Sequence, residues 1–317
     1  MLPHTALQSS DALTDMQIHL SIQTVMGYES PMTQENASCN AGMQELRQAI
    51  ARWGLVEDGL PFQTSTSALQ RVHLKDDTLA FLKVALCEEE RRGAALLRWW
   101  NGEGAVRVLA FHRNTVLLEC ACGGRSLTRM AQTGEDDEAS RIICHVAARL
   151  HNQVVPDSPE LMSPSIPQFI PLAQCFHSLA LAAATQGGIF QELSAIADSL
   201  LATPQQVVAL HGDLHHGNVL DAGMRGWLCI DPKGYLGERG FDHANIFCNP
   251  DYPTAIQPER FERRVNIVAE AAQLERHRLL SWVATWAGLS AAWHLEDGGN
   301  PDTALAVASL ALCALRR

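Results

Sequence analysis

The residues best suited to chemistry are concentrated in one stretch, LHGDLHHGNVL, which spans residues 210–220. Its polar members are His211, Asp213, His215, His216 and Asn218. Taken alone, the stretch has two simple interpretations, a zinc site built on the histidines and the aspartate, or a polar turn. Zinc sites usually draw on a further histidine or cysteine at a matching distance, and no H-x-H or H-E-x-x-H pattern follows. The stretch must therefore be interpreted together with its neighbours.

Asp213 and Asn218 have the D-x-x-x-x-N spacing of a kinase catalytic loop, and thirteen residues after Asn218 the apolar segment GWLCI ends at Asp231. Phosphoryl transfer requires a carboxylate that accepts the substrate hydroxyl proton, oxygen ligands for Mg²⁺, and a cation on the nucleotide phosphates. Asp213 would be the carboxylate, and Asn218 with Asp231 would bind the metal. Lys83, within the apolar segment AFLKVAL, would be the cation. Two side-chain ligands suffice, because Mg²⁺ also binds phosphate and water.

The elements that must position these residues change in character along the chain. Strands are expected in LPFQTSTSALQRVHL, AFLKVAL, AVRVLAF and TVLLECA, all before residue 123. Helices are expected over residues 43–53, 88–100, 138–153, 190–202, 258–273, 278–295 and 302–317. This order predicts an α+β protein with a small β-rich lobe over residues 43–119 and a larger, mostly helical lobe over 120–317. Residues 1–42 are expected to form a poorly ordered extension.

The composition narrows the classes of partner. Apolar residues make up 47% and charged residues 19% of the 317-residue chain, which predicts a globular protein with a sizeable core. The formal net charge of −11 argues against nucleic acid and favours a cationic small substrate. No apolar run approaches the roughly 20 residues of a membrane helix, and the N-terminal residues do not resemble a signal peptide, so we expect a cytoplasmic protein without a membrane partner.

The motifs together resemble a known family. HGDLHHGN, followed by IDPKGYLGERGFDHANIFCNP and preceded by AFLKVA, is similar to the aminoglycoside phosphotransferases, in particular the branch of aminoglycoside and hydroxyurea resistance kinases that includes the streptomycin 6-phosphotransferases. The resemblance extends from about Gly59 to Leu312. It implies a two-lobed protein-kinase-like fold that uses ATP and Mg²⁺. It also implies that Asp213 is the catalytic base, that Asn218 and Asp231 are the metal ligands, and that Lys83 contacts the nucleotide phosphates.

The same resemblance assigns further nucleotide contacts. Lys83 should pair with a carboxylate of the following helix, and we choose Glu90 from the run Glu88, Glu89, Glu90, whose register the sequence leaves open. Glu119 to Ala121 matches the hinge that offers backbone groups to adenine. The first hairpin, QTSTSALQRV, has no G-x-G-x-x-G. Small hydroxyl residues, from Thr64 and Ser65 to Ser67, would let the backbone approach the phosphates there.

Three further residue groups are interpreted from the sequence, two of them with alternatives. Lys233, which follows Asp231-Pro232, either contacts phosphate or pairs with an acid. Asp242 is interpreted as a brace for the catalytic loop. Trp282, Trp286 and Trp293 fall on one helix face, where core packing is favoured over a sugar-binding wall.

The function expected from these observations is transfer of the ATP γ-phosphoryl group to a hydroxyl of streptomycin or a related aminoglycoside, as in antibiotic resistance. One alternative is a kinase of hydroxyurea or of a metabolite alcohol, because the catalytic loop is common to many small-molecule kinases. Another is a nucleotide-binding pseudokinase. It is disfavoured because Lys83, Asp213, Asn218 and Asp231 are all present.

Overall fold

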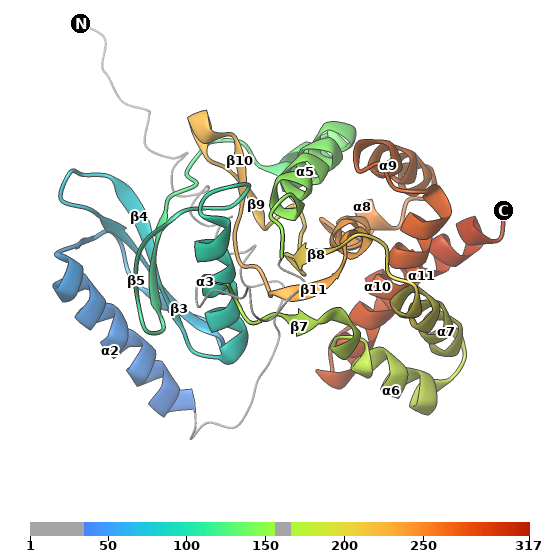
Figure 1. Ribbon diagram of the computed structural model, residues 1–317, viewed down its shortest axis with the longest axis horizontal. Helices are drawn as coiled ribbons and strands as arrows, with labels where there is room; N and C mark the ends of the chain where they lie inside the picture. The colour runs from blue at the N-terminus through green and yellow to red at the C-terminus, as the bar shows by residue number, and fades with distance from the viewer. Residues whose placement is uncertain (1–34, 156–165) are drawn as a thin grey trace, which may run out of the picture.

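The computed structural model describes residues 35–155 and 166–317. A β-rich lobe and a helical lobe lie at opposite ends of the molecule (Figure 1). Most of the extension expected over residues 1–42 lies outside the described residues. Its last part belongs to the helix α2 (Glu35–Trp53), which begins before the expected start at Met43. The strand β6 (Thr115–Glu119) is the last of the small-lobe sheet, and a lobe boundary between residues 119 and 120 remains our proposal.

The small lobe is built on one antiparallel sheet. Its strand order is β1 (Val56–Glu57), β3 (Ser67–His73), β4 (Leu79–Ala85), β6 and β5 (Val108–His112), and β2 (Phe62–Gln63) pairs with β3. The four strand-rich segments expected from the sequence account for β2 to β6. The helix α3 (Glu88–Trp100) has the bounds expected from its acidic first turn and its apolar face.

Alternation along the strands decides which side chains face the large lobe. Leu82 of β4 and Leu117 of β6 join a core beneath α2, whereas Val116 and Leu118 join the main core of the molecule. Because successive strand residues point to opposite faces, Lys83 lies on the face opposite Leu82, toward α3 and the large lobe. The sheet therefore presents one lysine at the junction of the two lobes.

The large lobe consists mainly of helices packed around α10 (Arg276–Glu296). The others are α4 (Leu127–Gln132), α5 (Asp136–His151), α6 (His177–Gln186), α7 (Ile189–Ala202), α8 (Tyr252–Ala255), α9 (Pro258–Ala271) and α11 (Asp302–Leu315). Trp282 and Trp286 of α10 are 1% and 6% exposed, so the core interpretation of these two tryptophans is confirmed. The sequence predicted the five long helices of this lobe and missed the shorter helices α4, α6 and α8, which have 6, 10 and 4 residues.

Five short strands form two small sheets that hold the two motif loops beside each other. In one sheet, β8 (Val207–Leu210) pairs with β11 (Tyr235–Glu238), which also pairs with β7 (Ile170–Pro171). In the other, β9 (Val219–Asp221) pairs with β10 (Trp227–Cys229). Both loops, residues 211–218 and 230–234, therefore run from one sheet to the other.

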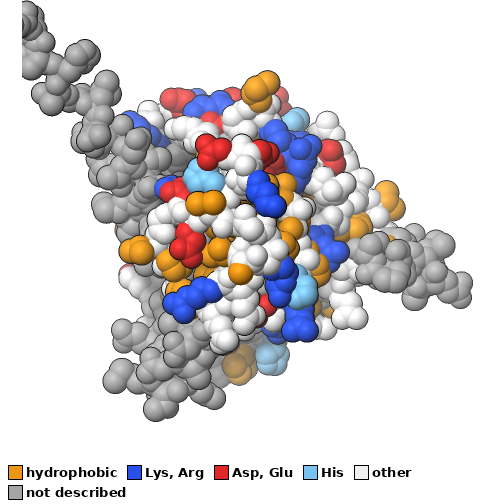
Figure 2. Space-filling model, turned by 90° about the vertical axis from the view of Figure 1, so that its left-hand side faces the viewer, with side chains coloured by type: hydrophobic (Ala, Val, Ile, Leu, Met, Phe, Trp, Pro, Cys, Tyr) orange, Lys and Arg blue, Asp and Glu red, His pale blue; other side chains and the backbone are white. Residues whose placement is uncertain are grey.

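The surface charge and the lengths of the helices are relevant to whether the protein binds a nucleic acid or a membrane. Figure 2 views the small-lobe end, where acidic, basic and apolar side chains are interspersed. Across residues 35–155 and 166–317, no helix is both long and apolar enough to cross a membrane.

Candidate active site

Lys83 is held between two carboxylates at the junction of the lobes. Its Nζ lies 2.6 Å from Glu90 Oε2 and 2.7 Å from Asp231 Oδ1. Burial would lower the pKa of Lys83, but Asp231 and Glu90 outweigh this and raise it above the ordinary value. The lysine therefore remains a buried cation. Of the other glutamates in the run, Glu88 pairs with Arg91 and Glu89 with Lys233, so the structure selects Glu90 as the partner of Lys83.

Asp213 is oriented by two side-chain amides. Its Oδ1 accepts from Asn245 Nδ2 at 2.8 Å, and its Oδ2 accepts from Asn218 Nδ2 at 3.2 Å. The side chain remains 20% exposed, so its carboxylate is both fixed and reachable. A carboxylate with these properties can accept a hydroxyl proton from a substrate placed next to it.

The backbone that carries Asp213 is braced from below by Asp242, which lies in the 3₁₀ helix η4 (Arg239–His243). Asp242 Oδ2 accepts from the backbone N of His211 at 2.8 Å and from His151 Nε2 at 2.8 Å, and its Oδ1 accepts from Gly212 N at 2.7 Å. Burial would raise the pKa of Asp242, but these partners hold it below its ordinary value. The expected bracing role of Asp242 is confirmed.

Two backbone conformations allow the loops to approach. Asp231 has φ 57°, in the left-handed region that non-glycine residues rarely adopt, and such strain is typical of functional sites. Gly212 has φ 87°, and a Cβ there would lie 2.6 Å from Tyr235 Cδ2. Glycine is therefore required immediately before Asp213.

Asn218 and Asp231 fit the requirements of a Mg²⁺ site. Ile230 N donates to Asn218 O at 3.0 Å, which joins the two loops next to both side chains. Asn218 Nδ2 donates to Asp213 and Lys83 donates to Asp231 Oδ1, so Asn218 Oδ1 and Asp231 Oδ2 are the oxygen donors that a metal ion could use. Hard oxygen donors of this kind suit Mg²⁺, which needs few protein ligands. Within the described residues, no group of three or more His, Cys, Asp and Glu side chains could hold a metal.

The side chains of Thr64 and Glu119, two of the residues expected around the nucleotide, are engaged within the protein. Thr64 Oγ1 accepts from the backbone N of Ser67 at 3.0 Å and so closes the β2–β3 turn, with Ser65 exposed at its tip. Glu119 accepts from Arg107 N at 2.6 Å and also pairs with Arg225. The carboxylate of Glu119 is thus engaged within the protein, and Ala121 follows in irregular backbone.

Sequence reasoning missed Asn245, which lies in the 3₁₀ helix η5 (Asn245–Cys248). Its Oδ1 accepts from Asn249 Nδ2 at 2.8 Å, so its own Nδ2 is turned toward Asp213. Arg264, 2% exposed, donates to the carbonyl oxygens of Ile246 and Asn249 at 2.5 and 2.9 Å and fixes this segment. Asn245 lies within the segment IDPKGYLGERGFDHANIFCNP, but no spacing rule connects it with Asp213, 32 residues earlier.

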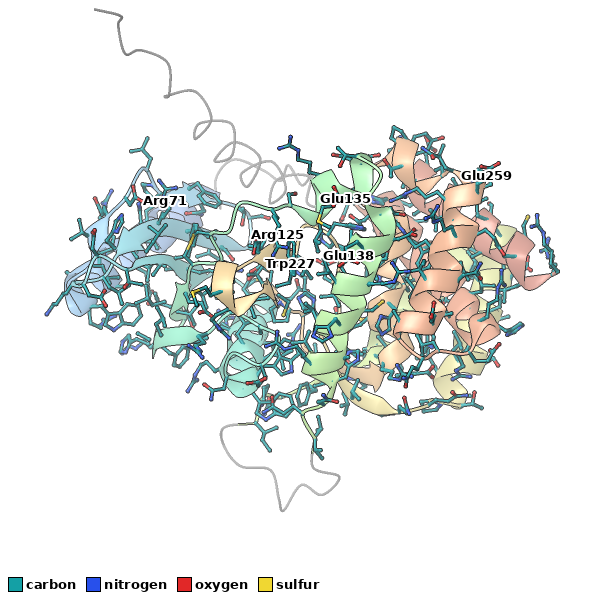
Figure 3. The ribbon with its side chains drawn as sticks, turned by 90° about the horizontal axis from the view of Figure 1, so that it is seen from above. Arg71, Arg125, Glu135, Glu138, Trp227 and Glu259 are labelled. Carbon is teal, nitrogen blue, oxygen red and sulfur yellow. A yellow bond between two sulfur atoms is a disulfide. The ribbon has the colours of Figure 1, made fainter. Side chains whose placement is uncertain are left out.

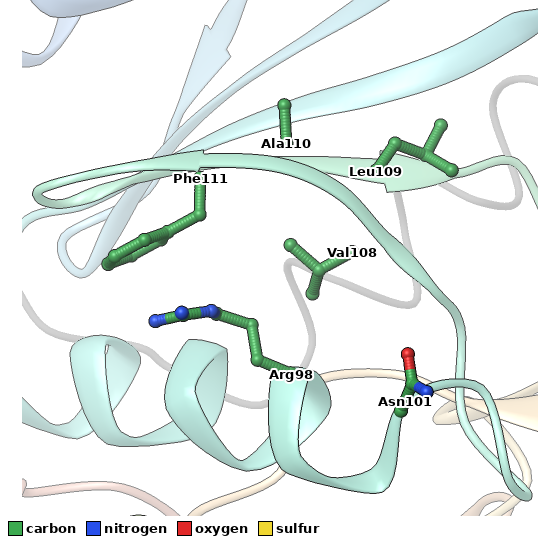
Figure 4. Close-up of a pocket in the computed structure, with 6 residues that line it drawn as sticks. All are labelled: Arg98, Asn101, Val108, Leu109, Ala110 and Phe111. Carbon is green, nitrogen blue, oxygen red and sulfur yellow. The ribbon is translucent and has the colours of Figure 1, made fainter. Parts of the chain in front are cut away.

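An arginine–tryptophan contact and a surface hollow lie outside the group of proposed catalytic and metal-binding residues. Figure 3 shows Arg125 beside Trp227, whose ring centroid lies 4.8 Å from Arg125 Cζ. Arg125 also pairs with Asp221 at 3.0 Å, which ties the segment after β6 to the β9–β10 hairpin. A hollow of about 310 Å³ lies between α3 and β5, where Arg98 stacks over Phe111 (Figure 4). No predicted site residue lines it.

Known proteins similar to the chain are consistent with this geometry. Residues 52–298 match the family described as aminoglycoside/hydroxyurea antibiotic resistance kinase. The chain is 45% identical over 273 residues to a streptomycin 3''-kinase of Klebsiella pneumoniae, covering 84% of this chain and 98% of that protein. It is 30% identical over 271 residues to a streptomycin 6-kinase of Streptomyces glaucescens, covering 80% and 83%.

Solved structures share the fold. An amicoumacin kinase in complex with AMP-PNP, Ca²⁺ and Ami has a TM-score of 0.63 at 11% identity, covering 89% of this chain and 95% of that one. An aminoglycoside phosphotransferase in ternary complex with ADP and hygromycin B has a TM-score of 0.57 at 14% identity, covering 86% and 97%. At these identities the likeness supports the expected two-lobed fold, and the relatives in sequence support the chemistry.

Proposed function

The chain belongs to the aminoglycoside/hydroxyurea antibiotic resistance kinases, and from that premise we propose that it transfers the γ-phosphoryl group of ATP to a hydroxyl of streptomycin. It is an enzyme of the small-molecule O-phosphotransferase class. The observation that carries the proposal is the convergence of Lys83, Asp213, Asn218 and Asp231, drawn from both lobes, on one junction. The identity of 45% to a streptomycin kinase supports the choice of acceptor.

The proposed roles follow from the contacts. Asp213, fixed by Asn218 and Asn245, accepts the proton of the attacking hydroxyl, while Lys83 donates to phosphate oxygens of the nucleotide. Asn218 Oδ1 and Asp231 Oδ2 would hold Mg²⁺, which when bound neutralises phosphate charge. Backbone groups from Glu119 to Ala121 would bind adenine, and the turn at Thr64 and Ser65 would cover the phosphates.

We propose the 3'' position of streptomycin as the acceptor site rather than the 6 position. The sequence resemblance alone suggested the streptomycin 6-phosphotransferases. The chain is, however, 45% identical to the 3''-kinase and 30% identical to the 6-kinase, and it spans 98% and 83% of those two proteins. Phosphorylation there would add a dianion to a cationic drug and so oppose its binding to an anionic target.

Two further proposals concern the surroundings of the reaction. The substrate is cationic, which suits a chain with a formal net charge of −11, because opposite charge speeds encounter. The reaction takes place in the cytoplasm, where ATP is available.

The experiment that tests the proposal is ADP release by the purified protein with Mg²⁺ and ATP, in parallel with streptomycin, other aminoglycosides, hydroxyurea and small alcohols. Strong stimulation by streptomycin, followed by assignment of the phosphate to the 3'' carbon by NMR, is the expected result. Stimulation by hydroxyurea or an alcohol with none by streptomycin would refute the acceptor. Nucleotide binding without turnover of any compound would favour a pseudokinase.

A further inference from the structure

Lysine is rare in this chain, and its few occurrences are placed unevenly. The sequence has three lysines, Lys75, Lys83 and Lys233, against 21 arginines. Lys75 is exposed on the small lobe, whereas the Lys83 and Lys233 side chains are 9% and 15% exposed at the junction of the lobes. An ammonium group is a compact point charge, unlike the broad planar guanidinium. Two compact cations are therefore concentrated where the proposed chemistry occurs.

The backbone places Lys233 beside the catalytic loop. Its N donates to the carbonyl oxygen of His211 at 2.6 Å, two residues before Asp213. A Cβ at Gly212 would lie 3.0 Å from Lys233 Cβ, so the lysine side chain starts against the residue that precedes Asp213. Lys233 is thereby tied to the catalytic loop rather than to the outer surface.

The small lobe supplies the partner of Lys233. Glu89, in the first turn of α3, lies 2.8 Å from Lys233 Nζ, and Arg92 Nε contacts the carbonyl oxygen of Lys233 at 3.4 Å. Glu89 accepts one of the three N–H bonds of the ammonium. Within the described residues, no second acceptor is paired with Lys233 Nζ, which leaves N–H donors for a ligand.

The charges around Lys233 indicate what that ligand is. Lys233 Nζ is paired with Glu89 at 2.8 Å, and the Lys233 backbone is bonded to the catalytic loop two residues before Asp213 and follows Asp231 by two residues. Lys83 is already paired with Glu90 and Asp231, so Lys233 is a second cation, beside the two loops that carry the proposed base and the proposed metal ligands. Transfer of a phosphoryl group concentrates negative charge in this region, and a fixed cation there stabilises the transition state.

We propose that Lys233 is a catalytic residue whose ammonium donates to the γ-phosphoryl oxygens of ATP, with Glu89 as the positioning residue that aims it. This inference rests on the proposed kinase function and adds a contact to it. In the step concerned, the substrate hydroxyl oxygen forms a bond to the γ-phosphorus and its proton passes to Asp213. The bond from the γ-phosphorus to the bridging oxygen breaks, and that electron pair leaves on ADP. Lys233 gains and loses no bond and stabilises the charge on the transferring group.

A purely structural pair between the lobes would behave differently from a catalytic lysine. Lys233→Met and Glu89→Gln each break the pair, so a structural role predicts similar effects from both. A contact with the γ-phosphoryl group predicts that Lys233→Met lowers kcat about 100- to 1,000-fold, while Glu89→Gln has a much smaller effect. Lys233→Arg should recover part of the lost kcat, because it restores the charge but not the compact shape. Lys75→Met is the matched control and should leave kcat unchanged.

Nucleotide binding provides a test that needs no acceptor. Dissociation constants for ADP and for AMP-PNP, each with Mg²⁺, are measured by calorimetry on the wild-type protein and on Lys233→Met. AMP-PNP carries a γ-phosphoryl group and ADP does not, so the variant should lose affinity for AMP-PNP by about tenfold relative to ADP. Equal changes for the two nucleotides, or no change, would overturn the proposal.

The two proposals can fail separately. Wild-type protein that binds AMP-PNP better than Lys233→Met but phosphorylates no streptomycin would refute the acceptor and keep the lysine contact. Protein that phosphorylates streptomycin with equal kcat in the wild type and in Lys233→Met would keep the function and refute the contact. Loss of kcat to the same degree in Lys233→Met and Glu89→Gln, with unchanged nucleotide preference, would assign the pair to structure alone.

Discussion

Replacing Asp242 by asparagine would keep the shape of the side chain and remove its charge and one acceptor oxygen. In the folded protein this carboxylate is 1% exposed and accepts from His211 N, Gly212 N and His151 Nε2 at 2.7–2.8 Å. The asparagine oxygen can take the place of Oδ2 and keep the bonds from His211 and His151. Its NH₂ group then faces the N–H of Gly212, which is left unpaired.

The expected cost follows from these contacts. A buried N–H without an acceptor costs about 1–3 kcal/mol, and each of the two remaining bonds loses roughly 1 kcal/mol when its acceptor becomes neutral. A neutral amide is easier to bury than a carboxylate, which offsets part of the sum. We therefore expect Asp242→Asn to lower the free energy of unfolding by about 2–4 kcal/mol.

The pH dependence of this difference has a definite sign. The pKa of Asp242 is lower in the folded protein than the ordinary value of 3.8, so the ionised carboxylate stabilises the fold above that value. This stabilisation is lost as the pH falls through the folded-state pKa. The difference between wild type and variant should thus be constant near neutral pH and narrow below about pH 4.

The assay is urea unfolding followed by the fluorescence of the seven tryptophans. Asp198→Asn is the matched control, because Asp198 is exposed on α7 and its loss should change stability by less than about 0.5 kcal/mol. An Asp242→Asn protein as stable as the control, or a difference that grows with acid, would refute the bracing role of Asp242.

Two other predictions concern the metal site and the core. Asp231→Ala should weaken nucleotide binding in the presence of Mg²⁺ and lower the rate of phosphoryl transfer. Titration of ADP with and without Mg²⁺ measures the loss of binding. An unchanged magnesium dependence would contradict the assignment of Asp231 as a metal ligand. Trp282→Phe removes the hydrogen bond from Trp282 Nε1 to Glu238 Oε1 at 2.7 Å. The free energy of unfolding measured by urea titration should therefore fall by about 1–3 kcal/mol. An unchanged free energy of unfolding would contradict the importance of this bond.

The elements that the sequence predicted are those whose signals are local. The helix over Glu88–Trp100 has acids in its first turn and an apolar face, and both properties are visible without the fold. By contrast, the strands β8 and β11 are short, and even their nearest paired residues, Leu210 and Tyr235, are separated by 24 intervening residues. Their existence depends on tertiary partners that no sequence period reports.

The same distinction applies to the site. The D-x-x-x-x-N spacing identifies Asp213 and Asn218 because both belong to one loop. The register of three successive glutamates is not local, since residues on a helix are turned by about 100° from one to the next and packing decides which meets Lys83. Asn245 reaches Asp213 only because the η5 segment folds beneath the catalytic loop.

We propose that Asp213 accepts the proton during transfer of the ATP γ-phosphoryl group to streptomycin. It is tested most directly by incubating streptomycin with ATP radiolabelled in the γ-phosphate, using wild-type protein and Asp213→Ala side by side. If Asp213 is the proton acceptor, the wild type produces labelled streptomycin and the variant is slower by about 100- to 10,000-fold, with the affinity for ADP preserved. Labelling at comparable rates by both proteins would contradict it.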